Sequence, residues 1–243
     1  MTDKIALLSD IHGNLFALDA VLAQLQDEGV ERIICLGDVA IFGPQPREVL
    51  ARLRNLGCPV VLGNTDAWAL DPAPRPKRNE DSKRFYAIEF WGAAQLSESD
   101  LAFIRTFFPV FEETFAGETS LCCYHGSPRS YNDPIRPTTP VEELAPMLDG
   151  RHATVLAGGH THEQMVRRHE EMLIVNPGSV GQPYEVAADG VRNPPWAEFA
   201  ILTVGAGHIG IELRRVAYDI TPLIAAVLGS DMPYADWWVA EWR

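Results

Sequence analysis

Short apolar runs alternate with segments of helical spacing along the first quarter of the chain, and each run stops at polar residues. The runs over 5–9, 30–36 and 59–62 predict buried strands. Between them, apolar side chains recur at helical spacing over 15–28 and around 49–56, and a glycine follows each of these helices. Strands separated by helices pair in parallel, and open sheets of this kind place their ligands beyond the carboxyl ends of the strands.

The rest of the chain predicts helices first and hairpins afterwards. The predicted elements are, in order, a loop over 71–79, helices over 81–95 and 97–106, a hairpin over 110–124 that turns at 116–118, a helix over 141–148, a strand over 154–157, a hairpin over 164–175, and strands over 198–204 and 208–216 joined by a turn at 205–207. One or two short helices follow from Thr221. We expect residues 1–243 to form one domain of α/β (α+β) class, in which two mixed sheets pack face to face with helices outside. Residues 67–107 form either a helical flap over the functional site or a helical hairpin packed on the sheet.

The first predicted strand ends in a pair of candidate metal ligands. Asp10 and His12 follow the apolar run and precede Gly13. Because side chains of an extended segment alternate between faces, we expect Asp10 and His12 to point the same way, with Gly13 turning the backbone beneath them. An Asp-x-His pair is weak evidence alone, since a polar turn after an edge strand has the same sequence.

Five further polar residues occupy equivalent places, each after a predicted strand and beside glycine or another candidate. They are Asp38, Asn64, His125, His160 and His162. Since the strand ends share one edge, we expect all seven side chains to converge. Oxygen and imidazole donors without thiolate suit Mn²⁺, our first expectation, or Fe²⁺, Zn²⁺, Ni²⁺ or Co²⁺ better than Ca²⁺ or Mg²⁺. Seven donors are too many for one ion, which predicts two divalent transition-metal ions about 3.5 to 4 Å apart.

The order of these motifs resembles that of the calcineurin-like metallophosphoesterase superfamily. The matching segments are Asp10-Ile11-His12, Gly37-Asp38, Gly63-Asn64, His125-Gly126 and Gly159-His160-Thr161-His162. Residues 176–181 also resemble a turn found in the small bacterial and archaeal phosphodiesterases of that superfamily. The resemblance implies a four-layer αββα sandwich. It also assigns ligands, with Asp10, His12 and His162 on the first metal, Asn64, His125 and His160 on the second, and Asp38 bridging both.

The resemblance further implies a hydrolase of phosphodiesters, phosphomonoesters or nucleotide anhydrides that acts through a metal-activated hydroxide. Asp38, Asn64 and His125 are then the expected catalytic residues. A carboxylate such as Asp38 has two oxygens with which to bridge metals. Asn64 can coordinate through oxygen and keep its amide N–H₂ to donate to a phosphate.

The chain departs from the superfamily pattern at Thr65. Many members read Gly-Asn-His there, and that histidine is thought to protonate the leaving group, whereas this chain reads Gly63-Asn64-Thr65-Asp66. A threonine hydroxyl is a poor general acid, so the source of leaving-group assistance stays open. Asp66 either orients a ligand histidine, holds a water or caps the following helix.

Substrate contacts are predicted from loop residues near the ligands. Arg129 and Arg136 follow His125 and are candidates to bind a phosphate or a leaving group. Trp68 and Tyr184 are candidates to stack on a nucleoside, with packing in the core or at the rim as the alternative. We therefore expect a small phosphate ester or a nucleotide as the substrate.

The net charge of the chain limits the classes of partner that it is expected to bind. A formal charge of −13 over 243 residues argues against non-specific binding to nucleic acids or anionic membranes. No run approaches the ~20 apolar residues of a membrane helix. The first residues also lack the basic flank and apolar core of a signal peptide, so we expect a cytoplasmic protein. The oligomeric state is left open.

Two other functions share these sequence features. A non-catalytic, metal-stabilised interaction scaffold is known on this fold in the retromer subunit, and a nucleotide-sensing regulatory protein would carry the same site. The complete set of seven candidate ligands favours catalysis over the scaffold. It does not separate an enzyme from a sensor.

Overall fold

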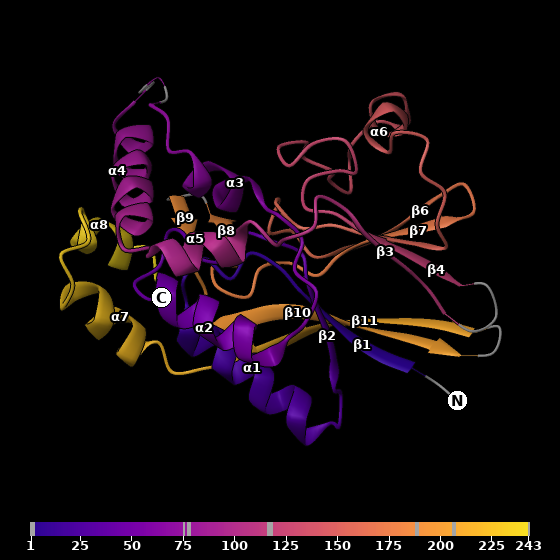
Figure 1. Cartoon of the computed structure of the whole chain (residues 1–243), viewed down its shortest axis with the longest axis horizontal. Helices are drawn as coiled ribbons and strands as arrows, with labels where there is room; N and C mark the ends of the chain where they lie inside the picture. Colours follow the sequence, from indigo (N-terminus) through magenta and orange to yellow (C-terminus); the bar gives the residue numbers. More distant parts are fainter. Residues whose placement is uncertain are drawn as a thin grey trace.

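A computed structural model describes residues 3–74, 76, 79–115, 119–187, 190–205 and 208–242. The turn predicted at 116–118 lies outside the described residues, as does most of the turn predicted at 205–207. Figure 1 shows two sheets lying against each other, with helices on their outer faces and a further group of helices at one end.

The first sheet joins the beginning of the chain to its end. Its strands run in the order β11–β10–β1–β2, with bounds β1 Asp3–Leu8, β2 Arg32–Cys35, β10 Trp196–Gly205 and β11 His208–Ala217. β1 pairs in parallel with β2 and antiparallel with β10, so the sheet is mixed. The strand predicted over 59–62 is reduced to isolated parallel bridges, one of them between Cys35 and Val60.

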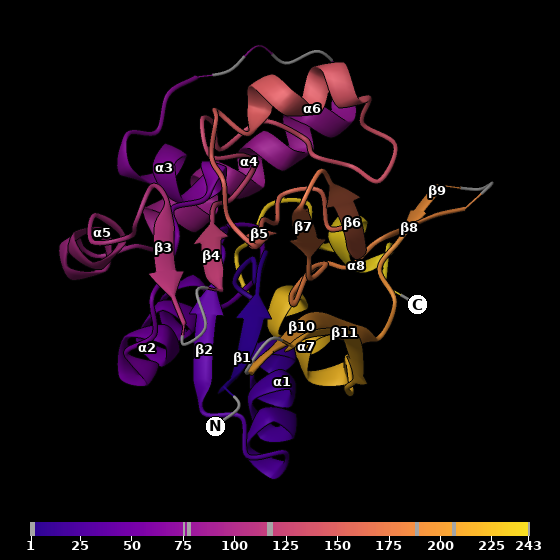
Figure 2. The same cartoon turned by 90° about the vertical axis from the view of Figure 1, so that its right-hand side faces the viewer.

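The second sheet comes from the middle of the chain. Its strands run in the order β3–β4–β5–β7–β6, with bounds β3 Phe111–Thr114, β4 Ser120–Cys123, β5 Val155–Ala157, β6 Met165–His169 and β7 Met172–Asn176. β4, β5 and β7 are parallel, and β3 and β6 pair antiparallel at the edges. In Figure 2 the arrowheads of β1, β2 and β4 point to the same side of the molecule.

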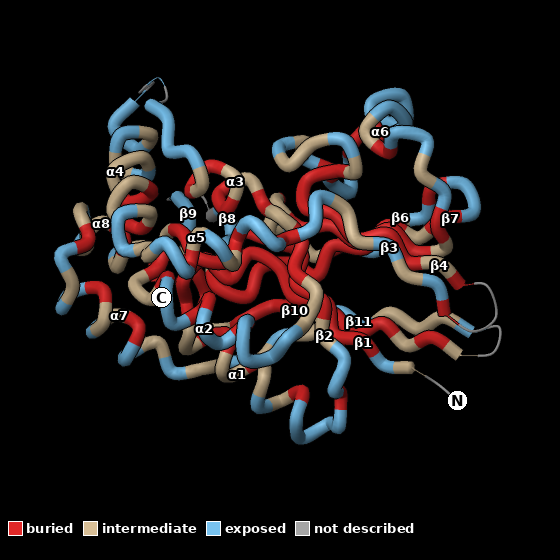
Figure 3. Tube along the Cα trace, viewed as in Figure 1, coloured by how far each residue is buried: buried red, intermediate tan, exposed pale blue. Residues whose placement is uncertain are grey.

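Alternating burial along the strands produces four layers. Ala6 and Leu8 of β1 pack with α1 (Leu15–Asp27) and α2 (Pro46–Leu56), whereas Ile5 and Leu7 join the apolar cluster between the two sheets. A third cluster lies between the second sheet and α6 (Val141–Met147). Figure 3 shows the buried residues running through both sheets. The predicted α/β sandwich of two mixed sheets flanked by helices is confirmed.

The remaining elements lie at one end of the sandwich. They are α3 (Asn64–Leu70), α4 (Glu80–Ala94), α5 (Glu98–Ile104), α7 (Thr221–Leu228), α8 (Ala235–Val239) and a small hairpin of β8 (Glu185–Ala187) and β9 (Gly190–Arg192). Ile88 of α4 packs with Leu223 of α7 and Trp238 of α8 in a separate apolar cluster. No helix in the described part of the chain combines the length and apolar content needed to cross a membrane.

Candidate metal centre

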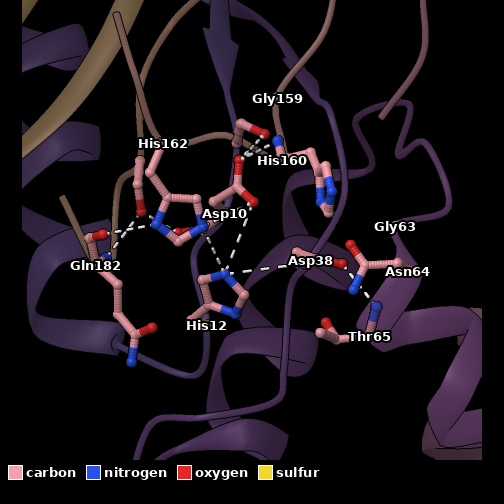
Figure 4. A network of polar contacts seen from close by, with 12 residues as sticks. Asp10, His12, Asp38, Gly63, Asn64, Thr65, Gly159, His160, His162 and Gln182 are labelled. Atoms are coloured by element: carbon pink, nitrogen blue, oxygen red, sulfur yellow. Dashed lines mark hydrogen bonds and ion pairs between the residues drawn. The ribbon is translucent and has the colours of Figure 1, made fainter. Parts of the chain in front are cut away.

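Loops at the carboxyl ends of the strands carry all seven candidate ligands to one place. Asp10 and His12 follow β1, Asp38 follows β2, Asn64 begins α3, His125 follows β4, and His160 and His162 follow β5. Figure 4 shows side chains from these separate loops turned toward one another. The side chains form two groups in which ligand atoms lie within 4.8 Å of one another: Asp10, His12 and His162 in the first, and Asp38, His125 and His160 in the second.

In the first group, three atoms with lone pairs surround a small space. Asp10 Oδ1 lies 3.2 Å from His162 Nε2 and 3.7 Å from His12 Nε2. The two Nε2 atoms lie 3.1 Å apart. Asp10 Oδ1 is fully buried and no described group donates a hydrogen bond to it. A buried carboxylate oxygen without a donor is costly unless a cation neutralises it, so this group fits a metal ion.

In the second group, atoms with lone pairs also face one another, and Asn64 belongs to this group. The Asn64 amide atom that faces the group lies 2.8 Å from His160 Nδ1, 3.1 Å from His125 Nε2 and 3.2 Å from Asp38 Oδ2. With the amide oxygen in that place, it faces only acceptors, and a cation would relieve the repulsion. With the nitrogen there, the amide donates to the same atoms. The other amide atom lies 3.2 Å from Thr65 N, beside the backbone rather than in open space for a phosphate.

Backbone carbonyls fix the tautomer of three of the four histidines. The Nδ1 contacts are His12 to Ile41 O at 2.9 Å, His125 to Leu36 O at 2.8 Å and His162 to Gln182 O at 2.7 Å. A carbonyl oxygen only accepts, so each Nδ1 carries the proton and donates it. In the neutral ring, Nε2 is then the nitrogen with the lone pair, and it faces the centre, which is the arrangement in which imidazole binds metals.

Asp38 connects the two groups through one oxygen. Oδ2 lies 3.4 Å from His125 Nε2 in the second group and 3.9 Å from His12 Nε2 in the first. Oδ1 instead accepts a hydrogen bond of 2.9 Å from the Thr65 backbone N–H. Oδ2 is therefore the oxygen of Asp38 that faces ligand atoms of both groups.

The backbone at the ligands differs from the extended form expected. β1 ends at Leu8, and the φ angles of Asp10 and His12 are 54° and 49°, in the left-handed region. The two side chains thus converge through a coiled loop and not through strand alternation. Gly13 does turn the chain, with φ of 64°, and an added Cβ would lie 2.5 Å from Ala40 O.

Left-handed geometry recurs at Asp38, His160 and His162, with φ angles of 55°, 69° and 55°. Non-glycine residues in this region cost about 1 kcal/mol or more each, and such residues gather at functional sites. Five of the seven candidate ligands share this strained backbone, which indicates that the position of their side chains matters more than local stability.

Asp66 positions the loop that carries Asp38. Its carboxylate accepts hydrogen bonds from the backbone N–H groups of Asp38 at 2.8 Å, Val39 at 3.0 Å and Gly63 at 3.1 Å. It therefore closes the first turn of α3, as the helix-cap alternative suggested, from the third helical position. Its contacts are with backbone and not with a ligand histidine.

Sequence reasoning missed a second set of positioning residues. Ser9 Oγ donates to Asp10 Oδ2 at 2.6 Å, and Ser179 Oγ donates to the Asp10 carbonyl at 2.7 Å. Asn176 Nδ2 donates to Gly159 O at 2.8 Å. The turn over 176–182 therefore holds the loops of both Asp10 and His160. The resemblance of residues 176–181 to a turn in related phosphodiesterases pointed to this segment, but it did not predict these hydrogen bonds.

Neighbouring charges in the centre shift one another's pKa values. Burial alone would raise the pKa of Asp38, but the neighbouring His125 lowers it to about 2. Burial likewise opposes protonation of His125, yet Asp38 raises the pKa of that imidazole to about 10. Burial and the charge of His125 lower the pKa of His160. Burial and the Asp38 charge raise the pKa of Asp66 to about 6.

The superfamily is settled by a model of the calcineurin-like phosphoesterase superfamily domain, which matches residues 4–206. The chain belongs to this superfamily. All seven candidate ligands lie inside the matched region.

Similar proteins align with this calcineurin-like phosphoesterase over nearly its full length. An uncharacterized protein of Methanocaldococcus jannaschii is 28% identical, covering 98% of this chain and 96% of that protein. The crystal structure of a metallophosphoesterase from Sphaerobacter thermophilus is 25% identical with a TM-score of 0.72, covering 98% of this chain and 97% of the other. A hypothetical protein from Pyrococcus horikoshii is 21% identical, covers 95% and 94%, and shares the fold with a TM-score of 0.78.

Two cavities open beside the ligands of this phosphoesterase-family centre. One, of about 310 Å³, is lined by Arg136, His162, Glu163, Tyr184 and Val186. The other, of about 210 Å³, includes Tyr184, His160 and His162 in its lining. Tyr184 thus stands between the cavities, with its ring centroid 5.8 Å from that of His162.

The other predicted substrate contacts lie in different settings. Arg136 borders the larger cavity and pairs with Glu163 at 3.2 Å. Arg129 pairs with Asp133 at 2.7 Å and is not part of either lining. Trp68 is buried and packs edge-on against Phe90, so core packing is its role in the fold.

Proposed function

We propose that this protein is a metal-dependent phosphoesterase that uses a pair of divalent transition-metal ions. The observation that supports the proposal most strongly is Asp38 Oδ2, a buried carboxylate oxygen facing ligand atoms of both groups. A single oxygen between two sets of donors suits a shared ligand of two cations. The intact ligand set favours this function over the non-catalytic scaffold.

Asp10, His12 and His162 would hold the first ion, and Asn64, His125 and His160 the second, with Asp38 shared. The donor set is imidazole, carboxylate and amide, for which Mn²⁺ is our first choice and Fe²⁺, Zn²⁺, Ni²⁺ and Co²⁺ are alternatives. When bound, two such ions lower the pKa of a coordinated water toward ~7 and neutralise charge on a phosphate during in-line attack.

The protein's own residues set the geometry for that chemistry. The contacts of Nδ1 with backbone carbonyls hold the rings of His12, His125 and His162 with Nε2 aimed at the centre. Asp66 holds the backbone of Asp38. These contacts exist before substrate arrives, so little reorganisation is needed in the transition state.

Phosphodiesters are the substrates we favour. A diester carries two organic groups on one phosphorus, and two cavities flank Tyr184 at the ligands. Arg136, in the larger cavity, is better placed than Arg129 to contact the ester. Thr65 supplies no acid, since its hydroxyl is buried, so a leaving group of low pKa is the expected preference.

A metal-by-substrate panel tests the proposal. The chain is stripped of metal, resupplied with Mn²⁺, Ni²⁺, Zn²⁺ or Mg²⁺, and offered an aryl monoester, an aryl diester and several nucleotides. We expect Mn²⁺-dependent turnover with the aryl diester highest. Two bound ions without turnover of any ester would favour the scaffold or the sensor instead, and activity without added metal would contradict the proposal.

A further inference from the structure

The smaller cavity beside the ligands has one apolar side and one polar side. Phe85, Tyr184 and Trp238 supply aromatic rings, and Gln182, Asn193 and Glu241 supply amide and carboxylate groups. His160 and His162 complete the lining, so an organic group in this cavity adjoins the phosphate position. Its volume of about 210 Å³ is below the roughly 300 to 1,000 Å³ of sites for drug-sized ligands, and suits a single ring system.

Three separate segments build the cavity. Phe85 comes from α4, Tyr184 and Asn193 flank the β8–β9 hairpin, and Trp238 comes from α8. The Asn193 N–H donates to Glu241 O at 2.7 Å, which fixes the residue after β9 to the C-terminal segment. Trp238 and Glu241 lie beyond residue 206, where the match to the superfamily model ends. The cavity is therefore an addition to the common metal site.

Exposure of Phe85 indicates that the apolar side receives a ligand. Phe85 is 43% exposed, although its ring contacts those of Phe42 and Trp237 edge-on. An exposed aromatic ring at the mouth of a polar site is unfavourable in water and favourable under a stacked ring. The aromatic lining therefore indicates a flat ligand.

Glu241 defines the chemistry of the polar side. Burial and the charge of Asp81 raise the pKa of this half-buried carboxyl group. In the described part of the chain, its side-chain contact is with Asn193 Nδ2 at 3.4 Å, and no cationic side chain forms an ion pair with it. A carboxylate without a cation repels anionic groups and accepts from N–H donors. The amides of Asn193 and Gln182 add donors and acceptors that a trimethylammonium group could not use.

We propose that this cavity binds a nucleobase with an exocyclic amino group, so that the substrate is a nucleotide ester with the phosphate on the metal centre. The proposal rests on the phosphoesterase function proposed above. Guanine is the preferred base because its N1–H and N2–H₂ are adjacent donors for one carboxylate. Uracil presents a carbonyl on each side of its N–H and is disfavoured.

The test compares p-nitrophenyl esters of GMP, UMP, phosphocholine and methyl phosphate with the Mn²⁺-loaded full chain. Water attacks phosphorus, the bond to the nitrophenyl oxygen breaks, and nitrophenolate and a proton are released in every case. We expect kcat/KM for the GMP ester to exceed that of the methyl ester about tenfold, as stacking predicts. Preference for the phosphocholine ester, or equal rates for the GMP, UMP and methyl esters, would overturn the proposal.

Variants locate the preference in the cavity. Phe85→Ala should reduce kcat/KM about tenfold more for the GMP ester than for the methyl ester. Glu241→Gln should bring the ratio of GMP to UMP ester close to one. Phe108→Ala is the matched control, since Phe108 is 44% exposed and does not line the cavity. Retention of both preferences in Phe85→Ala and Glu241→Gln would contradict the assignment.

A binding measurement separates this proposal from the phosphoesterase function. If none of the four esters is hydrolysed, the phosphoesterase function fails, and calorimetry still compares GMP with ribose 5-phosphate on the Mn²⁺-loaded chain. Tighter binding of GMP that is lost in Phe85→Ala would support the base site alone. Equal affinities for the two ligands would overturn it.

Discussion

The two ligand groups have similar donors but are held differently. In the first group, His12 and His162 each donate Nδ1–H to a backbone carbonyl, and Asp10 Oδ2 is fixed by Ser9 Oγ and the His160 N–H. In the second, His125 is anchored in this way. Among the described residues, no backbone carbonyl contacts a ring nitrogen of His160, and Asn64 can present either amide atom.

This difference predicts that the two groups differ in metal affinity. A ligand whose tautomer and orientation are fixed beforehand loses little entropy when a metal binds. On the proposal of a two-ion centre, the first group would retain its ion, whereas Asn64 and His160 would adjust as the second ion and the substrate bind. We expect the first group to bind its ion more tightly.

Asp38→Asn should have the largest effect, because it removes the charge shared by the groups. We expect diester turnover to fall roughly thousandfold or more, since a neutral amide would replace the anionic ligand shared by both ions. Steady-state rates with saturating Mn²⁺ measure this, with the exposed Asp27→Asn as the control. A variant as active as the wild type would remove Asp38 from the centre.

Gly159→Ala should damage the first group while leaving its ligands in the sequence. An added Cβ would overlap Ser9 Oγ and lie 2.6 Å from Asp10 Oδ2. We expect about hundredfold lower activity, as for lost support of a metal ligand. Gly210→Ala is the control, because its Cβ would meet Thr203 Cβ at 3.5 Å. Equal activity of the two variants would show that Asp10 has freedom to move.

Asp66→Asn should weaken the support for the loop that carries Asp38 to the second group. An amide cannot accept from all three backbone N–H groups, so the loop of Asp38 loses part of its support. We expect a 10- to 100-fold loss in metal affinity or activity and a cost of about 1 to 3 kcal/mol in stability. Chemical denaturation and Mn²⁺ titration give the two values. An unchanged Mn²⁺ affinity would mean that Asp66 only closes the first turn of α3 and does not support metal binding.

Metal titration should resolve the groups directly. Calorimetry with Mn²⁺ is expected to show two phases whose affinities differ about tenfold. This is the lower limit of the effect that groups hydrogen-bonded to metal ligands have on metal affinity. His12→Ala should remove the tight phase and His160→Ala the weak one. If His160→Ala removes the tight phase, the order of affinities proposed here is reversed.

Proton release should give the smallest effect. The pKa of His125 is raised to about 10 by Asp38 against burial, above its ordinary 6.5. In the metal-free protein this protonation stabilises the fold fully below pH 6.5, and the stabilisation is lost as pH rises through about 10. A cation must displace that proton, so affinity should rise about tenfold per pH unit for each proton displaced. Calorimetry in buffers of different ionisation enthalpy measures the release, and its absence at pH 7.5 would contradict a protonated His125.

The sequence was sufficient to predict the layers and the meeting of the ligand side chains. The carboxyl ends of β1 and β2 lie at one edge of the first sheet, and those of β4 and β5 at one edge of the second, so polar residues after these strands were expected to converge. It did not predict the left-handed backbone at Asp10, because that conformation depends on contacts with the turn over 176–182. Nor could it show that the Thr65 N–H occupies Asp38 Oδ1.

The aromatic cavity was the least predictable part. Tyr184 was a candidate from its place in the sequence, but Phe85 and Trp238 come from helices that meet through tertiary packing. The β8–β9 hairpin was not predicted, since Glu185–Ala187 and Gly190–Arg192 are too short for alternation to show. The proposed base site is built by helices that meet through tertiary packing, whereas the candidate metal ligands follow the order of the strands.

The most direct test of the central claim is anomalous diffraction from crystals grown with Mn²⁺. We predict two peaks about 3.5 to 4 Å apart, one among Asp10, His12 and His162 and one among Asn64, His125 and His160, with Asp38 between them. One peak alone, or two peaks away from these side chains, would contradict a shared two-ion centre.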